Sequence, residues 1–183
     1  MSLLKSNYGK ETNIRESRKI PIFIPFTDDG TIEGNGDINV DGSTSTKEFY
    51  LSPPSNLEYS VLGLAVRVTD GGSPAYDDYG NVNGPLANGI SFFLVQGGVE
   101  TQLSPVIKRN IDWLQFGPKI SIVEFSNSVR FLTYTLDISN LSTSIVLEGS
   151  HNDKLGCRID DDLTGLISHE ISIQGFSRII SFS

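Results

Sequence analysis

Cysteine and histidine are almost absent from this chain of 183 residues, which holds one cysteine, Cys157, and two histidines, His151 and His169. A single cysteine cannot close a disulfide within the chain. Three such side chains are also too few for a four-ligand zinc site. Disulfide and structural-zinc chemistry are therefore poor starting points for its function.

Long apolar runs are missing as well. No stretch approaches the ~20 residues that cross a bilayer. The first ten residues, MSLLKSNYGK, lack the apolar centre of a signal peptide. We therefore expect that the protein does not associate with a membrane and that it is synthesised in a cytoplasm.

The composition favours one packed domain with many turns. Hydrophobic residues make up 38% of the chain and include ten Phe and six Tyr, which is enough apolar surface for a core. The 18 Gly and 8 Pro follow no period, so they disfavour long helices and require frequent turns.

Strand patterns run through the chain from Ile20 onward. The clearest before residue 104 are Ile20–Phe26, Lys47–Leu51, Tyr59–Thr69, Ile90–Gln96 and Val99–Leu103. Further short strands follow from Lys119 to the end, and LISHEISIQG and SRIISF read as two of them. We predict an all-β, antiparallel, jelly-roll-like β-sandwich over residues 20–183, with an extended arm over residues 1–19. The spacing in Pro105–Phe116 predicts at most one short helix.

Two strands carry more detailed predictions. Pro21 and Pro25 remove ladder donors, so Ile20–Phe26 should lie at a sheet edge. In Tyr59–Thr69 one face is predicted to face the core; it consists of Leu62, Leu64, Val66 and Val68. The polar stretch over residues 70–85 should form a long surface loop.

Charge is distributed unevenly along the chain. The net charge is -8, but residues 1–19 hold five Lys or Arg against two Glu, so this segment is +3 and the remainder is -11. The segment is polar and lacks apolar periodicity, so it should order only on a partner or remain a frayed terminus. Direct binding to nucleic acid is not expected, because the body is acidic.

One string matches the spacing of an EF-hand calcium loop. Asp37, Asn39, Asp41 and Glu48 occupy ligand positions, with Gly42 at the turn. The flanking residues are those of strands rather than helices. A hairpin turn is therefore the preferred interpretation, and calcium binding is the alternative.

Other polar residues do not define a catalytic centre. Asp160, Asp161 and Asp162 could form an acid pair or a metal site, but a solvated turn is the preferred interpretation. His169 alternates with Ile167 and Ile171, as expected for a partly buried strand position. No G-x-S-x-G or Walker A motif occurs. We expect that the protein is not an enzyme, that it binds no cofactor and that it has no metal site.

The order of several short motifs resembles small β-rich structural proteins of tailed bacteriophages. These motifs are IPIFIPFTDDG, LANGI, NIDW, DDLTGL and ISIQG, and they span roughly residues 20–175. The resemblance implies a virion location and a capsid decoration or cement protein, a head-fibre base or a neck protein. It also implies other virion proteins as partners.

Two functions follow as expectations. The first is a structural virion component that forms a homo-oligomer through its arm and sandwich surfaces. Its candidate assembly residues are Leu3, Leu4, Lys5, Tyr8, Lys10, Ile14, Arg15 and Arg18. The alternative is a carbohydrate-binding module or receptor-binding fibre domain, for which Tyr76, Tyr79 and Trp113 are the candidate stacking residues.

Overall fold

The structure is a computed structural model of the full chain. It describes residues 19–71, 79, 85–103, 105–109, 112, 119–125, 129–137 and 145–180, with backbone only for 119–125 and 129–137. The candidate assembly residues between Leu3 and Arg18 lie outside this part, as do Tyr76 and Trp113.

Ten strands and the 3₁₀ turn η3 are the named elements in the described part of the chain. They are β1 (Ile20–Pro25), β2 (Lys47–Leu51), β3 (Leu57–Gly71), β4 (Ile90–Gln96), β5 (Val99–Gln102), β6 (Lys119–Phe125), β7 (Val129–Asp137), β8 (Ile145–Glu148), the turn η3 (Gly149–His151), β9 (Lys154–Ile159) and β10 (Ser168–Ile179). The prediction of an all-β protein is confirmed, and β1 begins at Ile20 as expected.

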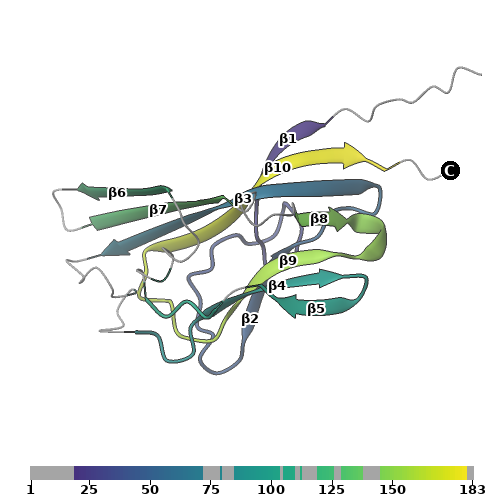
Figure 1. The fold of residues 1–183 in the computed structure, drawn as a ribbon. Helices are drawn as coiled ribbons and strands as arrows, with labels where there is room; N and C mark the ends of the chain where they lie inside the picture. Colours follow the sequence, from purple (N-terminus) through teal and green to yellow (C-terminus); the bar gives the residue numbers. More distant parts are fainter. Residues whose placement is uncertain are drawn as a thin grey trace, which may run out of the picture.

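The strands form two antiparallel sheets that pack face to face (Figure 1). The first sheet has the order β1-β10-β3-β7-β6, and β8 also pairs with β3. The second sheet has the order β2-β9-β4-β5. In Figure 1 the first sheet lies above the second, and the hairpin of β6 and β7 forms one end of the first sheet.

The pairing is nested in the manner of a jelly roll. β1 pairs with β10, β2 with β9, β3 with β8 and β4 with β5, so the chain forms one long hairpin rolled into two sheets. The β6–β7 hairpin is inserted between β5 and β8, and its strand β7 pairs with β3 beyond β8. The predicted jelly-roll-like sandwich is therefore present, with one additional hairpin.

The core lies between the inner faces of the two sheets. The first sheet contributes residues such as Val66, Ile171 and Ile173, and the second contributes Phe92 and Leu155. All five are at most 2% exposed. Burial of such side chains stabilises the fold by about 1.5–3 kcal/mol each.

The prolines of β1 lie on the free edge of the first sheet, as predicted. The amide of Phe26 donates to the carbonyl of Ile171 on β10 at 2.7 Å. Because the backbone amides of alternate residues point toward the neighbouring strand, and that of Phe26 points toward β10, the nitrogens of Pro21 and Pro25 point away from β10. The two prolines therefore cost no ladder bond and leave the outer edge short of donors.

A β-bulge corrects the predicted core face of β3. Gln174 is opposite Gly63 and Gly175 is opposite Val61, so Leu62 is the extra residue. Val61 is fully buried, whereas Leu62 is 37% exposed. The assignment of Leu64, Val66 and Val68 to the core is right, but that of Leu62 is wrong, because the bulge reverses the alternation.

Two other predictions need correction. Pro105–Phe116 does not begin as a helix, because Ile107 exchanges backbone hydrogen bonds with Ile90 at 2.8 and 2.9 Å. The two segments expected near the C-terminus form one strand, β10, that passes through Gly175. A Cβ at Gly175 would lie 2.0 Å from the carbonyl oxygen of Ser60, so glycine allows the strand to continue through the bulge.

Candidate functional site

One side of the sandwich is formed by an acidic loop region. After β1 the chain crosses to the second sheet, where the amide of Thr27 donates to Tyr50 at 3.0 Å. It returns to the first sheet where the amide of Ile38 donates to His169 at 2.7 Å. The backbone of Asp41 then forms an isolated antiparallel β-bridge with that of Asp162. The loop that follows β1 therefore lies beside the turn that follows β9.

We call the acids of this region the acidic rim. They are Asp28, Asp29, Glu33, Asp37, Asp41, Asp160 and Asp162. Hydrogen bonds from Thr31 lower the pKa of Asp29, and those from Ser43 lower the pKa of Asp41. None of the rim acids makes an ion pair within the described residues. The rim is therefore a strongly negative surface at neutral pH.

The predicted calcium ligands do not converge on one point. An oxygen of Asp37 accepts the amides of Asn39 and His169, both at 3.1 Å, and an oxygen of Asp41 accepts the amide of Ser43 at 2.9 Å. Glu48 pairs with Arg158 at 2.8 Å. Among the described residues, no group of three His, Cys, Asp or Glu is arranged to hold a metal ion.

The preferred hairpin at this position is also wrong. The segment before Gly42 and the strand β2 both pair with residues of the 155–163 region, so the chain bulges out between them instead of reversing. A Cβ at Gly42 would lie 2.2 Å from the carbonyl oxygen of Ile159, which explains why glycine occupies this position. The acids with EF-hand spacing therefore belong to closely spaced turns of this segment, in which Asp37 and Asp41 each accept an amide two positions later.

Asp161 is a buried structural carboxylate, which the solvated-turn prediction missed. Its Oδ2 accepts the amide of Asn88 at 2.8 Å and also that of Gly89. Gly89 has a φ of +88°, a conformation that glycine adopts readily. Asp161 therefore joins the turn before β4 to the turn after β9, whereas Asp162 is exposed and caps Thr164.

The contact of Asp161 with the amides of Asn88 and Gly89 is called the Asp161 clamp below, and a polar depression lies beside it. It has a volume of about 460 Å³ and is lined by residues 42–46 together with Asn88 and Asp160. Asp160 accepts a hydrogen bond from the hydroxyl of Thr46 at 2.6 Å. The lining combines hydroxyl, amide and carboxylate groups, so it offers both donors and acceptors.

Tyr79 and His169 form a buried aromatic pair. The Tyr79 hydroxyl lies 2.9 Å from Nε2 of His169, and their exposed fractions are 1% and 0%. Burial lowers the pKa of His169 to about 3, so its ring is neutral at ordinary pH. His169 is more deeply buried than predicted. Tyr79 cannot provide a stacking surface for a sugar, because its ring is enclosed.

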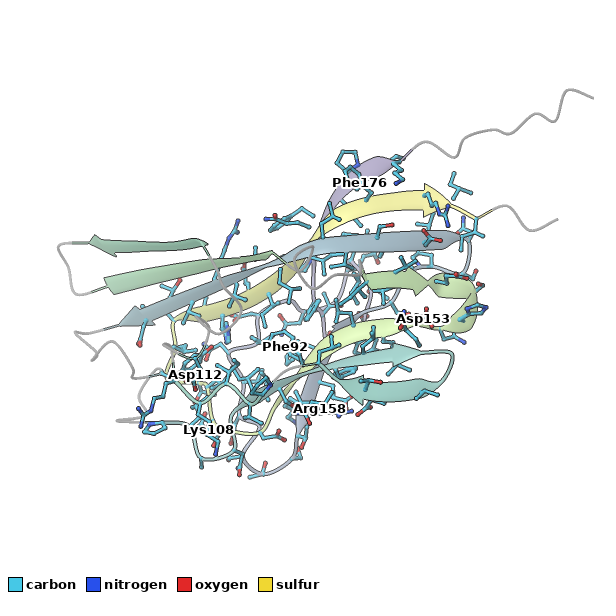
Figure 2. All side chains as sticks on the ribbon, viewed as in Figure 1. Phe92, Lys108, Asp112, Asp153, Arg158 and Phe176 are labelled. Carbon is cyan, nitrogen blue, oxygen red and sulfur yellow. The ribbon has the colours of Figure 1, made fainter. Side chains whose placement is uncertain are left out.

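Arg158 organises the outward face of the second sheet, and no pattern in the sequence indicates this role. Its two Nη atoms each contact an oxygen of Glu100 at 2.7 Å, and its Nε contacts Glu48. The guanidinium also lies 4.6 Å from the centre of the Phe93 ring. Hydrogen bonding to Arg158 lowers the pKa of Glu100. Figure 2 labels Arg158 on this sheet, where it connects β9 to β2 and β5.

No protein-family model matches the sequence, and no curated protein shows significant similarity to it. No helix in the described part of the chain is long and apolar enough to cross a membrane.

The Asp161 clamp can be tested by comparing neighbouring carboxylates. Asp161→Ala should lower the free energy of unfolding by about 2–4 kcal/mol, because two amides lose their acceptor in a largely buried turn. Asp162→Ala is the control and should change it by less than about 1 kcal/mol. Urea denaturation measures both. Equal losses in the two variants would contradict the clamp.

His169 should make stability depend on pH. Its pKa is about 3 in the folded protein, compared with an ordinary value of 6.5. Within that window the unfolded chain binds the proton and the native protein does not. Stability should therefore fall as pH drops below about 6.5, by at most ~1.4 kcal/mol per unit.

His169→Gln removes this titration and retains a polar side chain. Between about pH 4.5 and 6.5, where most carboxylates remain ionised, the slope of stability against pH should be smaller in this variant than in the wild type. Urea denaturation at several pH values measures the difference. Identical slopes would contradict a neutral buried His169.

Proposed function

We propose that the protein is a structural component of a tailed-bacteriophage virion that assembles through its N-terminal segment and its sandwich surfaces. The observation that carries this proposal is the separation of charge between the two parts of the chain. Residues 1–19 are +3, whereas the body is -11 and presents the acidic rim. Opposite charges steer association between the segment of one copy and the body of another.

The fold is compatible with this role. Jelly rolls form viral capsid domains as well as lectin domains, so the architecture admits both a virion component and a carbohydrate-binding domain. The motif resemblance described above favours the virion component. It points to a decoration or cement protein, a head-fibre base or a neck protein, with other virion proteins and copies of itself as partners.

A synthetic peptide of residues 1–19, added to the full-length protein, tests the charge argument. Fluorescence anisotropy should show binding that weakens as salt rises, because screening acts at ~8 Å at physiological ionic strength. Asp29→Asn, Glu33→Gln and Asp41→Asn together should weaken binding about tenfold at low salt. Detection of the chain in particles of the phage that encodes it is the direct test of virion location.

A control distinguishes the rim from net charge. Glu148→Gln removes an acid on β8, outside the rim, and should leave most of the peptide affinity intact. If both variants weaken binding equally per charge removed, the rim is not a docking surface. If the peptide does not bind even at low salt, the proposed role of the segment fails.

The polar depression favours a carbohydrate-binding domain as the second candidate. Sugars present alternating donors and acceptors, which Asn88, Asp160 and the hydroxyls of residues 42–46 could match. The aromatic stacking expected of Tyr79 does not contribute, because this ring is buried.

Saturation-transfer NMR with a panel of soluble oligosaccharides tests this candidate. Any binding at the depression should be lost in Asp160→Ala and retained in Asp162→Ala, because Asp160 lines the depression and Asp162 does not. The absence of transfer across the panel, or binding that survives Asp160→Ala, contradicts a sugar site there.

A further inference from the structure

We propose that the outer face of the first sheet, over β1, β10 and β3, is the surface through which two copies of this chain associate. The proposal rests on the assembly role proposed above and makes it more specific. It names the surface through which the sandwich domains of two copies contact each other. Its evidence is the apolar surface, the charge balance and the blocked sheet edge of this region.

An apolar patch occupies this face. It consists of Pro21, Phe23, Leu62 and Phe176. Phe23 is 49% exposed and Leu62, the extra residue of the bulge, is 37% exposed. Scattered exposed hydrophobic residues are common on proteins, but a group on one sheet face indicates an interaction surface.

The strand register brings the members of the patch together. Pro21 lies opposite Phe176, and Phe23 lies opposite Gln174, which in turn lies opposite Gly63. The bulge places Leu62 beside Gly63 on the side away from the core. Phe23 and Phe176 are diagonal neighbours, at the ~7–8 Å spacing that aromatic side chains can bridge. Figure 2 labels Phe176 beside β1, away from the second sheet.

The charges around the patch are paired. Arg67 pairs with Glu170 at 3.8 Å, and Arg178 pairs with Glu58. The Arg67 guanidinium also lies 5.6 Å from the centre of the Phe23 ring. Exposed aromatic side chains next to arginine are typical of protein interfaces.

The balance of charge on this face favours a second copy of the chain as its binding partner. The chain has a net charge of -8, so two copies repel each other through most of their surfaces, above all through the acidic rim. The two ion pairs on the β1, β10 and β3 face sum to zero, and their exposed members, Arg67, Glu170 and Arg178, present both signs, because the Glu58 side chain is only 6% exposed. Two such faces can approach without strong repulsion, and an arginine of one copy can meet the exposed Glu170 of the other.

The geometry also favours contact through the face instead of the edge. Pro21 and Pro25 place their nitrogens on the free edge of β1, which hinders addition of another strand there. The face is large enough for a dimer. The three strands β1, β10 and β3 at ~4.8 Å spacing, with a twelve-residue strand at ~3.4 Å per residue, cover about 14 by 40 Å, on the order of the ~800 Å² per partner of a standard interface.

Sedimentation velocity of the full-length protein over a range of concentrations tests the proposal. The wild type should form a reversible dimer or a larger assembly built from it. Phe23→Ser with Leu62→Ser should raise the dissociation constant at least ~10-fold, because both side chains lie at the contact. Ile32→Ser with Val99→Ser is the matched control. These two side chains are more exposed, at 70% and 67%, but lie elsewhere, so the control should leave association unchanged.

Arg67→Glu provides a second variant with little risk to folding, because the Arg67 side chain is 58% exposed. It makes the face negative, so the dimer should dissociate at low salt and partly recover at about 0.5 M salt, where charges are screened. Circular dichroism melting curves confirm that each variant is folded.

Three results overturn the proposal. They are a wild type that is monomeric at every concentration, association that the patch variants leave unchanged, and equal weakening by the control pair. If deletion of residues 1–19 abolishes association while the patch variants retain it, contact through the segment stands and the face contact fails. The reverse result leaves the face contact standing and removes the segment as the source of self-association.

Discussion

The ladder between β3 and β10 is the constraint on which the rest of the sandwich depends. These are the two longest strands, and their pairing runs from Leu57 to Thr69. One side of β10 supports β1, and one side of β3 supports both β8 and β7. The inner side chains of the same two strands form the larger part of one wall of the core. A break in this ladder would therefore divide the first sheet into two parts, β1 with β10 and β3 with β6, β7 and β8.

Most of the fold follows from local sequence patterns, whereas the corrections come from long-range contacts. The alternation of apolar residues locates β2 and β4 at their observed bounds, and the prolines identify β1 as an edge strand. The bulge at Leu62 could not be predicted, because it depends on the close approach of Gly175 to Ser60. Ile107 likewise pairs with Ile90 across a reversal of the chain that no local pattern shows.

The polar residues were harder to assign than the apolar ones. Three consecutive aspartates appear equivalent in the sequence, but only the middle one is a buried acceptor of two amides. Its partners lie more than seventy positions earlier, so spacing gives no indication of the contact. The role of Arg158 is equally hidden in the sequence, because it depends on glutamates from two other strands. The charge imbalance of the chain, in contrast, needs no structure, since it depends on composition alone.

The inserted β6–β7 hairpin has a consequence for how the molecule opens. It contacts the jelly roll through β7, which pairs with β3 between Gly63 and Gly71, while the earlier part of β3 pairs with β8. The hairpin can therefore detach without opening the nested pairs of the jelly roll. Amide protons along the single strand β3 would then report two different opening events, one from the inserted hairpin and one from the sandwich as a whole.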